Sequence, residues 1–277
     1  MSAPPGHFQL APDHHAALAR AVLVLERPSF AIRIADLAGQ PVARVFGMLP
    51  RIANRQLVRL LETAILRCLA VAIDSLDETP AAHPSASPSR WVPRVITGVT
   101  GGIAGLFGAV ALPIELPLTT MMMLRAIADI ARHHGEDLAS PEAALACLEV
   151  FALADRRLDR RADVSYYATR TMLAKLTAEV TAVLVQRGAI DAASPLAARL
   201  CGEVAARFGL AVSERAAASA LPIVGALGGA SVNIMFMNHF QQIAEGHFMI
   251  RQLERRYGDD RVRGLYEAIA RREVEDR

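Results

Sequence analysis

The sequence predicts an all-α fold, a multi-helix bundle, and its composition and its residue pattern both lead to that prediction. Alanine, the best helix former, occurs 51 times in 277 residues, whereas aromatic residues, which favour strands, make up only 5%. No segment shows the alternation of apolar and polar residues that marks a half-buried strand. Hydrophobic residues make up 53% of the chain, which is enough for a packed core without disulfides or a metal.

Charge and cysteine content narrow the class of protein. The net charge is +2 and the arginines are spread along the chain, so we expect no nucleic-acid partner. Cys68, Cys147 and Cys201 lie far apart in apolar contexts, which indicates buried thiols in a reducing compartment. No phosphate-binding loop or nucleophile elbow occurs, so the sequence names no cofactor and no small-molecule ligand.

The first predicted helix has Asp13 as its N-cap and runs through Leu25 and Glu26, with Leu18 and Val22 facing the core. Residues 1–12 contain three prolines and are expected to form a flexible N-terminus. They lack the basic and apolar regions of a secretory signal, which favours a cytoplasmic location. Residues 13–277 are expected to form a single helical domain.

Two more helices and a loop are expected before the middle of the chain. Pro28 starts a short helix that ends at Gly39, and a longer helix runs from about Ile52 to Leu76, where Leu61 and Ile65 belong to the apolar stripe. Residues 78–90 are rich in proline and serine and lack a hydrophobic anchor. They are therefore predicted to be a flexible loop or linker.

Proline, serine and glycine mark the helix ends in the second half of the chain. Gly135 is expected to end one helix, and Ser140 is expected to cap the next, with Pro141 at its first position. The predicted order is a helix over Pro141–Ala154, a helix over Asp163–Arg187, a break over Gly188–Pro195, a long helix from Ser213 that breaks at Pro222, a turn at Gly258 and a charged final helix.

The hydrophobic residues are concentrated in two glycine-rich stretches. Val95–Ile114 and Ala216–Asn238 contain no charged residue, and each has glycines spaced four apart. About 20 apolar residues suffice to cross a bilayer, but prolines interrupt both stretches and small residues contribute little insertion energy. Two central helices of a bundle, or reversible membrane contact, are therefore favoured over stable spanning.

Several sequence blocks follow one another in an order found in a known family. Gly101–Leu138 (GGIAGLFGAVALPIELPLTTMMMLRAIADIARHHGEDL) precedes Cys147–Leu153 (CLEVFAL), Tyr166-Tyr167-x-x-Arg170, Phe208–Phe236 and Ala244–Gly258. These blocks resemble the EcsC family of bacterial proteins. The family takes its name from a protein encoded beside an ABC-transporter pair, and it has no agreed catalytic residues. The resemblance implies an accessory or interaction module near the inner membrane, with lipid or a membrane protein as partner.

One acidic residue stands at the end of the first apolar stretch. Burial of the Glu115 carboxylate is costly unless it is paired, and Thr119, Thr120 and Arg125 are near enough in sequence to satisfy it. A structural ion pair is favoured over an ion, proton or headgroup site.

A second set of polar residues lies on the helix after Asn233, which is itself a polar interruption of the second stretch. His239 and His247 are eight residues apart and share one helix face, and Arg251 and Glu254 are expected to pair with each other. With Glu149 they suggest an alternative function, a metal-dependent hydrolase with a Glu/His site, although no standard metal-binding spacing occurs. Tyr166, Tyr167 and Arg170 are expected to anchor a helix at the core edge.

Overall fold

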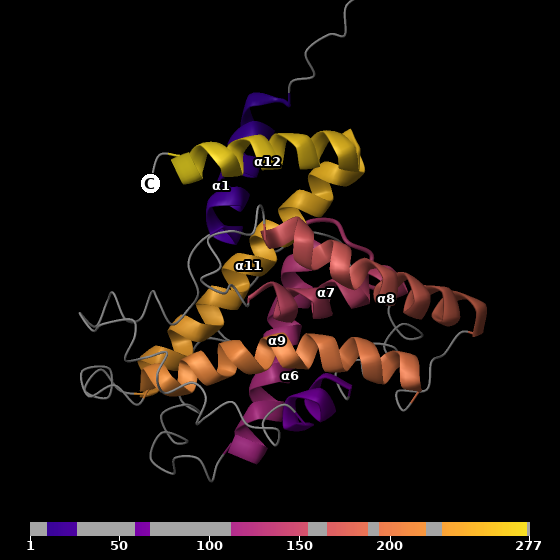
Figure 1. Cartoon of the computed structure of the whole chain (residues 1–277), viewed down its shortest axis with the longest axis vertical. Helices are drawn as coiled ribbons and strands as arrows, with labels where there is room; N and C mark the ends of the chain where they lie inside the picture. Colours follow the sequence, from indigo (N-terminus) through magenta and orange to yellow (C-terminus); the bar gives the residue numbers. More distant parts are fainter. Residues whose placement is uncertain are drawn as a thin grey trace, which may run out of the picture.

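The computed structural model describes residues 10–26, 59–66, 112–154, 165–187, 194–219 and 229–275, and every regular element in these ranges is an α-helix (Figure 1). The predicted all-α class is confirmed. The named helices are α1 (Pro12–Leu25), α6 (Leu112–His133), α7 (Pro141–Leu153), α8 (Ser165–Arg187), α9 (Pro195–Ser219), α11 (Gly229–Tyr257) and α12 (Asp259–Glu275).

Helix α11 is the central element of the bundle. It contacts α1, α6, α7, α9 and α12, and Figure 1 shows it crossing the molecule diagonally between α9 and the pair α1–α12. Helices α7, α8 and α9 also pack on one another. Because α11 passes from one end of the bundle to the other, its successive turns contact different helices. The candidate site lies at the turns of α11 that carry polar side chains.

Most described helix ends agree with the sequence signals. Gly135 has φ of 77° and Gly258 has φ of 92°, values in the left-handed region that glycine adopts without strain. The Ser140 hydroxyl accepts a hydrogen bond of 3.2 Å from the amide of Ala143, and Pro141 is the first residue of α7. The predicted ends of α6, α7 and α11 are thus confirmed.

The predicted start of α1 is wrong. The helix begins at Pro12, its N-cap is Ala11, and no side chain caps it. The ring of Pro12 already has the helical φ and needs no amide partner, so a helix can begin there without a capping oxygen. Asp13 lies inside the first turn and does not cap the helix. Its negative charge there interacts favourably with the positive end of the helix dipole.

The N-terminal helix packs closely on α11. A Cβ added at Gly246 would lie only 3.0 Å from Cγ of Leu25, so only a residue without a side chain allows this approach. Leu18, Val22 and Leu25 are buried as predicted, and so are Leu61 and Ile65 of the helix over residues 59–66. The start of α1 is further held by His14, whose Nδ1 lies 2.6 Å from the hydroxyl of Tyr257.

Two cysteines behave as the sequence indicates. Cys147 and Cys201 are buried, and burial raises the pKa of the Cys147 thiol to about 12. Cys68 lies outside the described residues.

Several predictions also fall outside them: the N-terminus 1–9, the helix Pro28–Gly39, the loop 78–90, and most of the Ile52–Leu76 helix and of the two glycine-rich stretches. Within the ranges that are described, no helix is both long enough and apolar enough to cross a bilayer.

Candidate functional site

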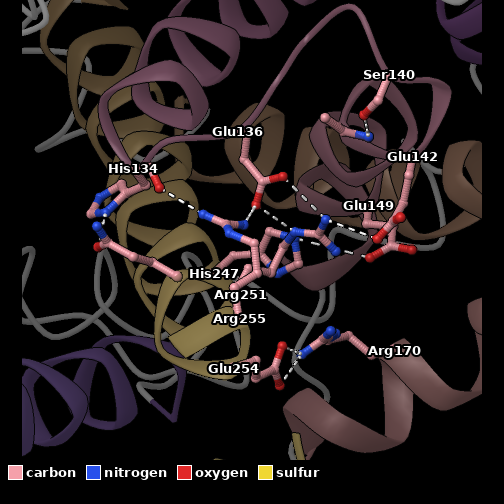
Figure 2. A network of polar contacts seen from close by, with 12 residues as sticks. His134, Glu136, Ser140, Glu142, Glu149, Arg170, His247, Arg251, Glu254 and Arg255 are labelled. Atoms are coloured by element: carbon pink, nitrogen blue, oxygen red, sulfur yellow. Dashed lines mark hydrogen bonds and ion pairs between the residues drawn. The ribbon is translucent and has the colours of Figure 1, made fainter. Parts of the chain in front are cut away.

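Buried polar side chains gather where α11 passes α7, α8 and the loop that joins α6 to α7 (Figure 2). The pattern of α11 explains why they come from one helix: His247, Arg251 and Glu254 lie three or four residues apart and therefore on one face. Figure 2 shows two ion-pair groups with the imidazole of His247 beside them.

The first group is centred on Arg251. Its Nε donates to Glu136 Oε1 at 2.8 Å, and its Nη2 donates to Glu142 Oε1 at 3.2 Å. Arg255 also donates to Glu136, and to the carbonyl oxygen of His134 at 2.7 Å. Burial by itself would raise the pKa of Glu136, but the hydrogen bonds and charges of the two arginines outweigh it and lower that pKa. This group fixes the loop before α7 against α11.

The second group joins α8 to α11. Arg170 Nη1 donates to both carboxylate oxygens of Glu254, at 2.8 and 3.0 Å, and the Tyr167 hydroxyl donates to Glu254 Oε1 at 2.9 Å. The guanidinium also lies over the rings of Tyr166 and Tyr167, each with its centroid 5.5 Å away. The prediction that these three residues of α8 anchor a helix through polar partners is confirmed.

His247 lies between these groups, and its hydrogen-bond network assigns the position of its proton. Arg170 Nη1 donates to the Tyr166 oxygen at 3.3 Å, so the phenolic hydrogen is left to donate to Nδ1 of His247, 3.0 Å away. The imidazole therefore carries its hydrogen on Nε2. That nitrogen is buried without a hydrogen-bond partner, and its nearest ionisable neighbour is Glu149 Oε2 at 4.0 Å.

Burial disfavours the charged form of both members of this pair. The pKa of Glu149 is raised by burial, and the charges of Arg170 and Arg251 offset only part of that effect. Burial lowers the pKa of His247 well below its usual value, and the same two arginines lower it further. The carboxyl and the imidazole face each other across 4.0 Å, a gap too long for a hydrogen bond.

The Glu149 carboxyl borders an open groove of about 750 Å³ between α7, α8, α11 and α12. Charged side chains line it: Glu142, Glu149, Arg170, Arg251, Glu254, Asp259, Asp260 and Arg263. Alanine and threonine side chains of α8 line the remainder of its length, among them Ala174, Ala178 and Thr181. The groove is large enough for a small organic molecule.

The structure brings together only part of the predicted site. Glu149, His247, Arg251 and Glu254 meet around α11, whereas Thr119 and Thr120 are buried on α6 and Arg125 is exposed there. Asn233 Oδ1 accepts a hydrogen bond of 2.8 Å from Arg215, which ties α9 to α11. His239 is buried beside Phe240. The side chain of Glu115 lies outside the described part of the structure, so its pairing stays a prediction.

The predicted pairing of Arg251 with Glu254 is wrong. The two side chains pair with different parts of the bundle: Arg251 with Glu136 and Glu142, and Glu254 with Arg170 of α8. Spacing along one helix indicates which residues share a face, but it does not identify the partners on neighbouring helices.

Sequence reasoning missed Glu136 and Glu142 as functional neighbours. Glu136 follows the helix-ending Gly135, and Glu142 is in the first turn of α7, where an acidic residue is explained by the helix dipole alone. Nothing in the local pattern distinguishes such a residue from an ion-pair partner of α11. Two residues of the predicted metal site, Glu149 and His247, are neighbours in the structure. In the described ranges, however, no group of three or more His, Cys, Asp or Glu side chains is placed to hold a metal ion.

Comparison with known proteins gives one match. The model of the EcsC protein family matches residues 92–253, which include Glu149, Arg170, His247 and Arg251. No curated protein matches the chain, and no solved structure does. The matched segment spans more than half of the 277 residues, so the chain belongs to the EcsC protein family.

Proposed function

We propose that the chain is an accessory or interaction module that binds reversibly to the cytoplasmic surface of the inner membrane through the beginning of α6. One observation carries this proposal. Leu118 and Met121 are 48% and 47% exposed although both are large and apolar. They lie three residues apart and so share a helix face, and the exposed Arg125 follows four residues later on that face.

The chemistry of this face suits an anionic bilayer. Apolar side chains gain free energy when they enter the boundary between headgroups and acyl chains, and an arginine beside them attracts anionic lipid headgroups. The uncharged stretch Val95–Ile114 precedes this face in the sequence, with Glu115 and two further residues between them. The link to membrane transport is motivated by the family resemblance alone.

Vesicle flotation tests the proposal. We expect the full chain to float with vesicles of phosphatidylcholine and phosphatidylglycerol, and to float less with phosphatidylcholine alone. The double variant Leu118→Ser, Met121→Ser removes most of the apolar contact, so its partition coefficient falls by about tenfold or more. Arg125→Gln lowers the partition only into the anionic vesicles.

A matched control comes from α8. Met172 and Val185 are also exposed and apolar, at 45% and 70%, but lie on another helix. The double variant Met172→Ser, Val185→Ser is expected to float like the unmodified chain. Equal loss in both double variants, or an unmodified chain that stays in the supernatant with both kinds of vesicle, contradicts the proposal.

A further inference from the structure

The groove beside Glu149 has more acidic than basic groups available to a ligand. Each arginine that lines it already has a carboxylate partner: Arg170 has Glu254, Arg251 has Glu136, and Arg263 has Glu267 at 2.9 Å. The lining carboxylates of Glu149, Asp259 and Asp260 have no arginine or lysine partner in the described part of the chain. The uncompensated charge of the groove is therefore negative, and it complements a cation.

The deepest of these groups is incompletely satisfied. Glu149 is 9% exposed and accepts no hydrogen bond from any described residue, and His247 is 0% exposed with an unpartnered Nε2–H directed at the Glu149 carboxyl. Buried polar groups are hydrogen-bonded in almost all proteins, because an unsatisfied group costs about 1–3 kcal/mol. Glu149 lines the open groove and His247, which does not line it, lies 4.0 Å from the Glu149 carboxyl. An incompletely satisfied buried carboxyl at the wall of a groove is typical of a site that a ligand completes.

We propose that this groove binds a small organic cation with primary ammonium groups, a diamine or polyamine, and that the Glu149 carboxylate holds one ammonium while Asp259 and Asp260 face the other. The ammonium donates to one oxygen of Glu149. His247 Nε2–H donates to the other oxygen, once the 4.0 Å gap between the two side chains closes. The Tyr166 hydroxyl holds the imidazole in this orientation through Nδ1, so His247 and Tyr166 are positioning residues.

Other ligand classes fit the groove less well. An anion would need an arginine that is not already neutralised, and each arginine of the lining is paired. A metal ion would need a third ligand beside Glu149 and His247, which the described residues do not supply. The volume of about 750 Å³ and the methyl groups of Leu145, Ala146 and Ala174 suit a chain of methylenes between two ammonium groups.

Binding is coupled to one proton. In the free protein the Glu149 carboxyl is protonated over a wider pH range than an exposed one, so a cation that pairs with the carboxylate displaces that proton to solvent. The groups that face Glu149 are Glu142 on its own helix, Arg170 on α8, and His247, Arg251 and Glu254 on α11. The arginines stay charged and His247 stays neutral, so Glu149 is the group that changes charge on binding.

Isothermal titration of the full chain with 1,4-diaminobutane tests this assignment. We expect binding that strengthens as pH rises from 5.5, by up to tenfold per pH unit until the pH exceeds the pKa of Glu149. Titrations in two buffers of different ionisation enthalpy should show one proton released per ligand. Glu149→Gln keeps the shape of the protonated carboxyl, so it should fold normally, bind at least about tenfold more weakly and lose the pH dependence.

Glu203→Gln is the matched control, because Glu203 is an exposed acid of α9 that pairs with Arg207 away from this groove. It should bind like the unmodified chain. Inorganic phosphate, Mg²⁺ and Zn²⁺ are titrated separately. The assignment is overturned if the diamine does not bind, if Glu149→Gln binds it equally well, or if phosphate or a metal ion binds in its place with a dependence on Glu149. None of these outcomes depends on the membrane contact of α6.

Discussion

The two halves of α11 each bury one face, but these faces are held in opposite ways. At one end, Phe236 and Phe240 pack with Phe151 of α7 and Phe208 of α9, and the closest ring centroids, those of Phe151 and Phe208, are 4.7 Å apart. At the other end, His247 packs on Tyr166 of α8, with ring centroids 5.9 Å apart, and Tyr166 stacks on Tyr266 of α12 at 5.3 Å. Only the second set carries polar atoms that require partners.

The comparison indicates how one helix serves two purposes. Phenylalanine rings exchange neighbours at small cost as long as the volume is filled, so the Phe end contributes stability without fixing much chemistry. At the polar end each buried donor and acceptor needs a specific hydrogen-bond partner, and Glu254 accepts from both Arg170 and Tyr167. Such a network adds little net stability, but it fixes the orientation of its members and leaves the Glu149 carboxyl at the wall of the groove.

The largest expected effect is at the Phe end. Phe151→Ala leaves a cavity beside the rings of Phe208 and Phe240, so the free energy of unfolding should fall by about 3–5 kcal/mol in denaturant titrations. Val185→Ala on the exposed part of α8 is the control, with a change within about 0.5 kcal/mol. A loss below about 1 kcal/mol for Phe151→Ala would show that this end is not the stabilising one.

A smaller effect is expected when the polar end loses one charge. Arg170→Met leaves the Glu254 carboxylate buried with only Tyr167 as donor, so we expect a loss of about 3 kcal/mol, measured in the same way. Adding Glu254→Gln removes the uncompensated charge, so the double variant should recover part of that loss. If the two single losses simply add, Arg170 and Glu254 do not act as a pair.

The third expected effect is on how the stability of the fold depends on pH. Glu149 has a raised pKa in the folded state, so between its usual value of 4.5 and that raised value the folded chain binds more protons than the unfolded chain. Stability of the unmodified chain therefore falls as pH rises through this window, and it levels off above the folded pKa. Glu149→Gln has no such proton to lose.

Thermal unfolding without ligand measures this difference. The melting temperature of Glu149→Gln should be close to that of the unmodified chain at pH 4, should exceed it increasingly as pH rises through this window, and should exceed it by a constant amount above the window. Glu136 has a lowered pKa in the folded state, so its carboxylate stabilises the fold above pH 4.5 and this stabilisation is lost as pH falls. The loss occurs in both proteins and cancels in the comparison. A constant offset between the two melting curves over the whole pH range would contradict the raised pKa.

Local signals in the sequence predicted the helices and several of their ends well. Ser140, Gly135 and Gly258 act through their own backbone or through residues at most three positions away, so the sequence contains all the information that these ends need. Asp13 shows the limit of the same reasoning. Two local signals competed there, and the proline at position 12 decided where α1 begins.

The site could be predicted only in part, because its pairs join helices that are distant in the sequence. His247, Arg251 and Glu254 were found from their spacing on one helix face, but Arg251 meets a residue 115 positions away and Glu254 one 84 positions away. Those partners follow from how α7 and α8 pack on α11. Spacing within one helix contains no record of that packing, which is why the Arg251–Glu254 pairing failed.

The position of α1 has a consequence for the order in which the chain folds during synthesis. α1 leaves the ribosome early, but the helices that cover it, α11 and α12, are made late: Glu26 accepts a hydrogen bond from Tyr266, 240 positions later. Until then Leu18, Val22 and Leu25 lack the two helices of the described part of the chain on which α1 packs. A nascent or truncated chain that stops before α11 therefore lacks these two partners of an apolar helix face, and exposed apolar segments are those that chaperones recognise and that promote aggregation.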